Sequence, residues 1–574
     1  MAHLHKKMKK GRPYYYIREI ARVGGKPTVV SQIYLGSLER MAELAKGERT
    51  ASCNRIITQE FGALWLAHRI DQGVGLVSII DSVVGRKDSG KGPTIGEYFL
   101  YAVFNRMIDA CSKRALPDWY SHTAIQHIRP VDFLALDSQH YWEKWDRVEQ
   151  QDIETIAGSF FRRITEIEKP DADCFLFDTT NYYTYMASDT ESELAQRGNN
   201  KEGKDWLRQV GVALLVSRGS QIPIFYREFE GNRHDSKVFK RFLGEVLAAM
   251  ESSSQGRGEL TLVFDKGMNS LENVAGIDAA SGVHFITTYS PSFAEDLIRT
   301  KLALFKAVDT VKNRELVKKG REDDQLVAWR TTGTYWGRER TVIVTYNPRT
   351  AAKQRYSFDK KLLSLQQVLI DLREKVKSQK PHWISQKLIE SHYHKACERL
   401  YLPKDLYELS VEKEKKKWRL LFRKNYYRIG KHIERFGKNI IVTDHLDWST
   451  DQIVQASLDR YMVESAFRQS KDDDLVSVMP IRHWTDGKIR CHILTCVIAL
   501  AYLRLIELHL RRAGILMTAT TAMKKLHRLH SCLCWSASAR KPARMVEEPS
   551  DTQAQILRAF GFEIAGGVLQ PLAS

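Results

Sequence analysis

The sequence predicts a mixed α/β core that is split by a large inserted α+β block and preceded by a mainly helical, basic region. Three observations predict this class. Short β-rich runs alternate with one helical run between about residues 174 and 289, the pattern of a mixed sheet. Another β-rich run, KNIIVTD, appears near residue 440 after a long intervening segment. Between about residues 38 and 168, apolar residues recur at helical spacing.

The N-terminal 40 residues predict a basic β-hairpin. The stretch PYYYIREIARVGGKPTVVSQIYLGS has two β-rich runs around Gly24-Gly25, which is a hairpin signature. Residues 1–30 contain eight Lys or Arg and one Glu. Residues 41–168 are interpreted as a helical DNA-binding region, and a helical scaffold with a basic surface explains the same pattern equally well.

Residues 169–291 predict the first part of the core. The expected strands are CFLFDTT, QVGVALLVS, IPIFYREF, LTLVFDKG and HFITTYS, and the helical run SKVFKRFLGEVLAAM precedes the fourth of them. Residues 292–440 predict the inserted domain, with its own strand TVIVTYN and helix LSLQQVLIDLREKVKSQ. The second part of the core is expected at 441–510, followed by a C-terminal helical region at 511–574.

The composition favours a polyanionic partner, most simply nucleic acid. The chain has 88 Lys or Arg and 69 Asp or Glu, which gives a net charge of +19. Eight cysteines without framework spacing predict reduced thiols in the cytoplasm. The apolar run between His492 and Arg504 is shorter than the roughly 20 residues that span a bilayer, so it predicts a buried helix and no membrane partner.

Two aspartates end apolar runs of the predicted core. Asp178 follows Cys174–Phe177, and Asp265 follows Leu262–Phe264. Because sites in open α/β sheets form beyond the carboxyl ends of strands, the two carboxylates are expected close together, where they suit Mg²⁺ or Mn²⁺. Taken singly, each aspartate is equally compatible with a turn or a helix cap.

A third carboxylate lies in the stretch LDRYMVESAFRQSK. Arg460, Glu464, Arg468 and Lys471 follow one another at steps of 4, 4 and 3, which places them on one face of a helix. This helix is expected to begin at Ser449, in a capping box with Gln452, and to run towards residues 472–474. A single acid among three cations indicates a site that holds metal ions and, beside them, phosphate groups.

A basic and aromatic segment precedes this helix. Residues 412–439 contain eleven Lys or Arg and three Glu, interleaved with aromatic residues. Cations that follow phosphates beside stacking aromatics suit nucleic-acid contact, and Lys416, Trp418 and Arg423 are the expected contacts. The alternative is an amphipathic segment whose aromatic side chains belong to a core.

These motifs together resemble DDE-type insertion-sequence transposases, whose catalytic core is RNase H-like. The resemblance rests on FDTT with Asp178, on FDKGMNS with Asp265, and on Glu464 within R-x3-E-x6-K. One subgroup has a Y-x2-R-x3-E-x6-K signature and a β-rich insertion between the second Asp and the Glu. Arg460, Glu464 and Lys471 match that signature, whereas Ser457 occupies the tyrosine position. The segments EGNRHDS and MPIRHWTDGKIRCHILTCVIALAYL are also similar to these transposases.

The resemblance implies metal-dependent cleavage at the element ends and transfer of the released 3′-hydroxyl into target DNA. Asp178, Asp265 and Glu464 would hold two Mg²⁺ or Mn²⁺ ions, and Arg460, Arg468 and Lys471 would contact phosphates. The partners would be double-stranded terminal repeats, target DNA and a second copy of the chain in the synaptic complex, in a bacterial nucleoid. Two alternatives remain: an inactive DNA-binding descendant, and a phosphatase, for which Thr180 stands where a second acid is usual.

Overall fold

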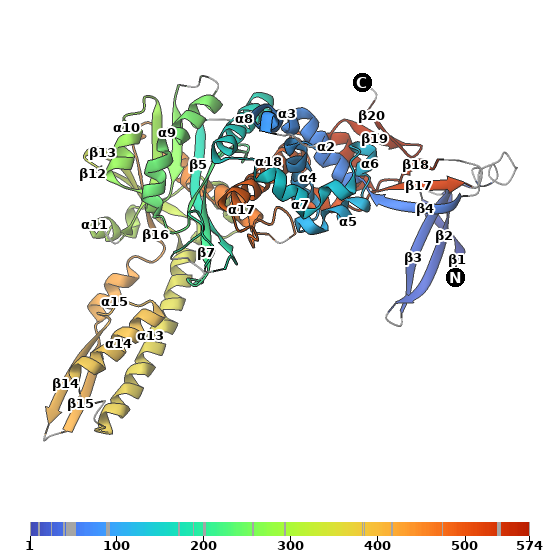
Figure 1. The fold of residues 1–574 in the computed structure, drawn as a ribbon. Helices are drawn as coiled ribbons and strands as arrows, with labels where there is room; N and C mark the ends of the chain where they lie inside the picture. The colour runs from blue at the N-terminus through green and yellow to red at the C-terminus, as the bar shows by residue number, and fades with distance from the viewer. Residues whose placement is uncertain are drawn as a thin grey trace. The chain divides into compact units, whose positions relative to one another are not determined.

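The computed structural model (Figure 1) divides into two compact units. One unit comprises Met1–Trp65, Asp118–Pro130 and Ala522–Ser574, and the other comprises Leu66–Pro117 and Val131–Thr521. The structure describes residues 2–9, 12–23, 26–37, 41, 53–87, 92–169, 173–187, 189–198, 203–254, 256, 258–291, 294–380, 383, 385–414, 417–472, 474–536 and 541–572.

The first unit begins with a three-stranded antiparallel sheet in the order β1-β2-β3. Its strands are β1 (Ala2–Lys9), β2 (Arg12–Val23) and β3 (Lys26–Gly36). The pairing of β2 with β3 confirms the strands of the predicted hairpin, whereas its Gly24-Gly25 turn lies outside the described residues. β1 is an additional strand that the sequence pattern did not reveal.

The C-terminal part of this unit corrects the expectation of a helical region at 511–574. It contains α19 (Ala519–Leu526), β17 (His530–Ser536), β18 (Ala543–Val546), α20 (Asp551–Ala559), β19 (Phe562–Ala565) and β20 (Val568–Pro571). β17 pairs with β18 and with β4 (Cys53–Glu60), a strand inside the region that was predicted to be helical. The partners are far apart in sequence, and a short apolar run does not by itself distinguish a strand from a helix.

The second unit contains the helices that were predicted before the core. They are α3 (Leu76–Val84), α4 (Ile95–Ile108), α7 (Ser138–Trp145) and α8 (Gln150–Glu168). α2 (Gly62–Val74) and α5 (Leu116–Ser121) cross the division between the units, and α6 (Ile125–Ile128) belongs to the first unit. α4 is buried along nearly its whole length and packs against α3 and α18 (Asp486–Arg512).

The predicted buried helix at 492–504 is confirmed as the middle of α18. Among the residues described, α18 is the one helix long and apolar enough to cross a membrane. However, 83% of its most apolar window is buried inside the protein, as in the core helix of a folded domain. α4, α7 and α8 all pack against α18.

The core is one mixed sheet in the order β11-β12-β13-β16-β10-β9-β5-β7-β6, with β8 paired to β7. β5, β9 and β10 are parallel neighbours, and the other pairs are antiparallel. The predicted strands and helix of residues 174–289 are confirmed. They are β5 (Cys174–Thr184), β7 (Arg208–Ser217), β8 (Pro223–Glu230), α9 (Asp235–Ser254), β9 (Leu260–Phe264) and β10 (Val283–Tyr289), with β6 (Gln196–Arg197) and α10 (Leu271–Asp278) in addition.

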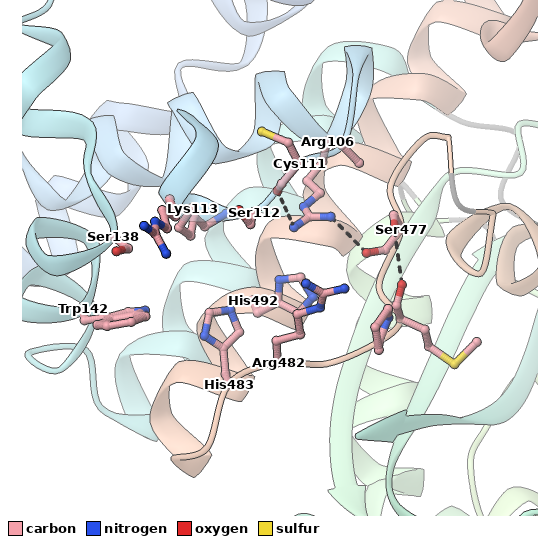
Figure 2. A pocket seen from close by; sticks show the side chains of 14 residues that line it. Arg106, Cys111, Ser112, Lys113, Ser138, Trp142, Ser477, Arg482, His483 and His492 are labelled. Carbon is pink, nitrogen blue, oxygen red and sulfur yellow. Dashed lines mark hydrogen bonds between the residues drawn. The ribbon is translucent and has the colours of Figure 1, made fainter. Parts of the chain in front are cut away.

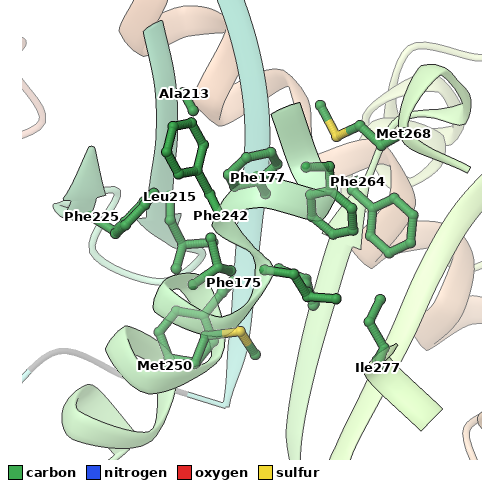
Figure 3. Close-up of a cluster of buried hydrophobic side chains, with 14 of the residues drawn as sticks. Phe175, Phe177, Ala213, Leu215, Phe225, Phe242, Met250, Phe264, Met268 and Ile277 are labelled. Carbon is green, nitrogen blue, oxygen red and sulfur yellow. The ribbon is translucent and has the colours of Figure 1, made fainter. Parts of the chain in front are cut away.

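One face of this sheet carries a cluster of aromatic side chains (Figure 3). Phe175 and Phe177 of β5 and Phe264 of β9 are fully buried there against α9 and α10. Phe239 of α9 lies 5.1 Å from the Phe177 ring and 4.9 Å from the Phe264 ring, between centroids. Since side chains alternate along a strand, Leu176 and Asp178 point to the opposite face, where α17 (Tyr461–Ser470) packs.

The inserted block is smaller than the predicted range 292–440. β11 (Lys306–Ala307), β12 (Val327–Tyr335) and β13 (Arg338–Tyr346) extend the core sheet, because β13 pairs with β16 (Lys438–Thr443) from Thr341↔Thr443 to Tyr346↔Lys438. α11 (Glu295–Ile298) and α12 (Val311–Lys318) accompany them. No local pattern encodes the pairing of β13 with a strand some hundred residues later.

The segment between β13 and β16 has its own core and is called here the excursion, residues 348–436. It contains α13 (Pro348–Lys377), α14 (Gln386–Leu400), β14 (Tyr407–Glu414), β15 (Lys417–Lys424) and α15 (Tyr426–Ile433). Leu365 and Leu369 of α13 and Cys397 of α14 are fully buried in its cluster. The Asn347 amide donates to the Gly437 carbonyl at 2.8 Å, so the excursion leaves and rejoins the sheet at one point.

Candidate catalytic site

Asp178 and Asp265 lie at the edge where the parallel pairing of β5 and β9 ends. The register pairs Leu176 with Val263, and two further residues on each strand lead to Asp178 and Asp265. Asp265 directly follows β9. Asp178 does not end its strand as predicted, because β5 continues to Thr184 along β7, with Asp178 opposite Leu214. An antiparallel partner therefore holds Asp178 rigidly where the parallel partner has ended.

Glu464 reaches the same place from α17. The predicted single helix is divided at Arg460 into α16 (Thr450–Asp459) and α17. Arg460 is the C-cap of α16 and the N-cap of α17, whose first turn includes the bond from the Glu464 amide to the Arg460 carbonyl at 3.4 Å. The Tyr182 hydroxyl and Ser470 Oγ form a 2.5 Å hydrogen bond that fixes α17 against β5.

Arg460 connects two of the three carboxylates. Its Nη1 forms an ion pair with Asp265, and its Nη2 lies 3.3 Å from Glu464 Oε1. The side chains of Asp265 and Glu464 are 34% and 46% exposed, so the cluster is open to a substrate. The guanidinium supplies, in this arrangement, the positive charge that allows two acids to lie together.

The electrostatics of the aspartates differ. Burial raises the pKa of Asp178 to about 6; the Thr179 amide hydrogen bond and the charge of Arg460 oppose the rise, while Asp265 and Glu464 add to it. Burial also acts to raise the pKa of Asp265, but the charge and hydrogen bond of Arg460 outweigh it, and the net direction is downward. Asp178 is therefore the carboxylate with the least compensated charge.

The donor set fits a hard divalent cation by its chemistry. Carboxylate oxygens are the ligands that Mg²⁺ and Mn²⁺ prefer, and Asp178 is a buried acid that an added cation would stabilise in its charged form. As the side chains stand, the described residues contain no group of three or more His, Cys, Asp or Glu close enough to hold a metal ion. Arg460 occupies Asp265 and Glu464 in this arrangement.

The predicted DNA-contacting residues fall in two places. Arg468 is exposed on α17, and Lys471 ends that helix with its Nζ 5.7 Å from the centre of the Tyr182 ring. Trp418 and Arg423 lie on β15 of the excursion, where Arg423 Nε pairs with Glu408 Oε2 at 2.5 Å. Trp418 packs against the excursion's core, as the amphipathic alternative expected. Lys416 lies outside the described residues.

Sequence reasoning missed the groups on the other side of the carboxylate edge. Thr179 Oγ1 donates to Asp235 Oδ1 at 2.9 Å, and Thr288 Oγ1 donates to Asp265 Oδ1 at 3.3 Å. Asp235 is the first residue of α9. Its place in EGNRHDS, a segment already noted for its resemblance, was the available signal.

Here two parallel strands and a flanking helix bring acidic and guanidinium groups to one sheet edge. This arrangement is typical of α/β domains that bind cations and phosphates. The chain belongs to the family of the transposase DDE domain, whose family model matches residues 169–502, more than half of the chain. It is a DDE transposase, a protein of DNA transposition. The matched segment contains Asp178, Asp265, Arg460 and Glu464.

Two further comparisons are less informative. No curated protein shows significant sequence similarity to the chain. Among solved structures, the chain is similar to the cryo-EM structure of a piggyBac transposase synaptic complex with hairpin DNA. That likeness has a TM-score of 0.38 and 8% identity over 83% of this chain and 82% of the other, which is too distant to carry an argument about this site.

Proposed function

We propose that this transposase cleaves DNA at the ends of its own insertion sequence and joins the released 3′-hydroxyl to target DNA. The observation that carries the proposal is the convergence of Asp178, Asp265 and Glu464 on one sheet edge, with Arg460 bridging two of them. The three carboxylates would hold two Mg²⁺ or Mn²⁺ ions. Such a pair, when bound, activates the attacking oxygen and stabilises the leaving one in phosphoryl transfer.

The chain's own cations orient the DNA. Arg460 balances Asp265 and Glu464 in the metal-free protein, and its bidentate fork turns to a DNA phosphate when bound cations neutralise those acids. Arg468 and Lys471, about one and two turns beyond Glu464, contact the neighbouring phosphates. β5 and β9 hold Asp178 and Asp265 at fixed separation, so the site is preorganised before DNA binds.

The finer assignments follow the sequence signature. The sheet is RNase H-like, and the subgroup is that of the Y-R-E-K signature, matched by Arg460, Glu464 and Lys471. Ser457 replaces the signature tyrosine, and the exposed Tyr461, one turn further on, takes its part in handling the DNA end.

The partners are the terminal repeats of the element, the target DNA and a second copy of the chain in the synaptic complex. The net charge of +19 supports a polynucleotide substrate. The basic sheet β1-β2-β3 and the helices within 41–168 bind the end duplex, and Trp418, Arg423 and Lys416 add contacts from the excursion. The protein acts in the cytoplasm of a bacterium, at the nucleoid.

The test is cleavage of a labelled duplex that carries the element end nearest the gene, with Mg²⁺, Mn²⁺ or EDTA. Glu464→Gln retains size and loses the charge that binds metal, and Glu251→Gln, at an exposed position of α9, is its matched control. Metal-dependent nicking by the wild type and Glu251→Gln, but not by Glu464→Gln, supports the proposal. End-specific binding without cleavage by any of the three proteins would instead identify an inactive, DNA-binding descendant.

A further inference from the structure

A second concentration of charge lies in the same unit, in a cavity of about 310 Å³ lined by four cationic side chains (Figure 2). Arg106, Lys113, Arg114 and Arg482 line it, and none of the described lining residues is acidic. The walls come from the end of α4 with the loop after it, from α7, and from the loop between α17 and α18. None of these four cations takes part in the carboxylate site.

Lys113 is the group that the fold leaves uncompensated. It is 6% exposed, and its Nζ has no hydrogen-bond partner within the described part of the chain. The rings of Tyr141 and Trp145 lie 5.3 and 5.1 Å from Nζ, so π-electron density helps to stabilise its charged form. Burial and the nearby Arg106 lower the pKa of Lys113 to about 7. A buried ammonium of this kind is costly unless an anion joins it.

Arg106 is held in place and keeps an unsatisfied donor. Its Nη1 donates to the Ser477 carbonyl at 3.0 Å and its Nη2 to the Cys111 carbonyl at 3.3 Å, while its buried Nε has no partner in the described structure. The opposing loop is strained, because Val476 and Ser477 have φ of 64° and 43°, a region that residues other than glycine rarely adopt. The guanidinium is therefore held between the Cys111 and Ser477 carbonyls, and the loop that supplies Ser477 has an unfavourable backbone conformation.

Two histidines, His483 and His492, also line the cavity. Burial, with Lys113 and Arg106, lowers the pKa of His483 to about 3, and burial with Arg106 lowers that of His492 well below its usual range. Their rings lie 5.1 Å apart, and His492 Nε2 lies 3.0 Å from the Val478 carbonyl. Burial, together with the nearby cations, therefore keeps both histidines neutral at neutral pH.

The cavity is tied to the catalytic edge through β5. Thr184, at the end of β5, donates from Oγ1 to the Ile481 carbonyl at 3.0 Å, and the Ile481 amide donates to the Tyr183 carbonyl at 3.2 Å. Ile481 adjoins the cavity residue Arg482. Asp178 and Thr184 are six residue steps apart on β5, so the strand length between them is about 20 Å at roughly 3.3 Å per residue. Along the axis of a duplex, an equal distance corresponds to about six nucleotides, at roughly 3.4 Å per phosphate of one strand.

We infer that this cavity binds a phosphate group of the DNA strand some six nucleotides from the position at the carboxylate edge. The inference rests on the proposed function for the choice of DNA as the source of the phosphate. Lys113 supplies a charge without an internal partner, Arg106 supplies a fixed donor, and Arg114 and Arg482 line the walls. Such a contact sets the register of the strand and carries no base sequence.

The test measures binding of the labelled end duplex in EDTA, which separates binding from cleavage. Lys113→Met removes the charge and retains an apolar side chain against the two rings. Lys144→Met is the matched control, because Lys144 is also buried, at 7% exposure, with its Nζ 6.0 Å from the Tyr98 ring, and it does not line the cavity. Arg482→Gln, at an exposed position, tests the site without altering the core.

Lys113→Met and Arg482→Gln are each expected to weaken duplex binding about tenfold and to reduce the salt slope by about one, whereas Lys144→Met binds like wild type. Equal affinity and slope in all four proteins would overturn the inference. If inorganic phosphate stabilises the wild-type protein against unfolding but not Lys113→Met, and duplex binding is unchanged, the cavity binds free phosphate. That result would overturn the DNA contact. Cleavage in Mg²⁺ is scored separately, so the inference and the proposed function fail independently.

Discussion

Replacing Asp178 with Asn removes the charge of a carboxyl group whose pKa burial raises from 3.8 to about 6. An acid with a raised folded-state pKa binds protons more tightly in the native state, so its effect on stability is absent well below pH 4. The native state then loses stability as the pH rises from about 4 through about 6. The difference between a pKa of 3.8 and one of about 6 corresponds to a loss of about 3 kcal/mol in the free energy of unfolding above that window.

Asp178→Asn is therefore expected to stabilise the metal-free protein at pH 8 by up to about 3 kcal/mol, and by about half of that at pH 5. The same substitution abolishes DNA cleavage in the proposed mechanism. Stability that rises as activity disappears is the signature of a residue whose buried charge serves a ligand.

The assay is denaturant unfolding in EDTA at pH 5 and pH 8, with Asp296→Asn, at an exposed position of α11, as the control. A destabilised Asp178→Asn protein at pH 8, or a gain of equal size at both pH values, would refute the reasoning. Repeating the unfolding with Mg²⁺ adds a second criterion, because bound metal should stabilise wild type more than the variant.

The remaining predictions concern the site's cation and the core. Arg460→Lys loses the fork that reaches both Asp265 and Glu464, and end cleavage should fall about a hundredfold in a gel assay; unchanged cleavage would remove Arg460 from its role. Gly231→Ala would place a Cβ 1.9 Å from the Gln209 carbonyl oxygen and should cost about 2 kcal/mol or more in denaturant unfolding, with Gly244→Ala, whose Cβ meets nothing within 4 Å, as the tolerated counterpart. Phe177→Ala empties part of the aromatic cluster and should cost about 3–5 kcal/mol; a loss below about 1 kcal/mol would show that the cluster relaxes around the gap.

The convergence of Asp178 with Asp265 was predictable because parallel strands end at a common edge and because both residues close strongly apolar runs. Arg460 and Glu464 were predictable from helical spacing. The sequence did not reveal that Asp178 lies within a longer strand, because the antiparallel neighbour that extends β5 comes from a separate part of the chain. The same limitation hid Asp235, whose link to Thr179 depends on tertiary packing and not on spacing.

The strands at the division between core and insertion show the limitation most clearly. TVIVTYN and KNIIVTD were both recognised as β-rich runs, but their pairing as β13 and β16 was not, so β13 was assigned to the wrong side of the boundary. Likewise, β4 and β17 form a pair across most of the length of the chain. Hydrophobic periodicity identifies such strands singly, whereas sheet order depends on which edges meet in the folded state.

The excursion enters and leaves the sheet between Asn347 and Gly437, two residues joined by a backbone hydrogen bond. In topological terms it is the loop of a β-hairpin, and the entropy of closing a loop grows only slowly with its length. A segment attached in this way can be lengthened, shortened or exchanged during evolution without disturbing the register of β13 and β16. The positions of Asp178 and Asp265 can therefore remain fixed while the size of the excursion changes.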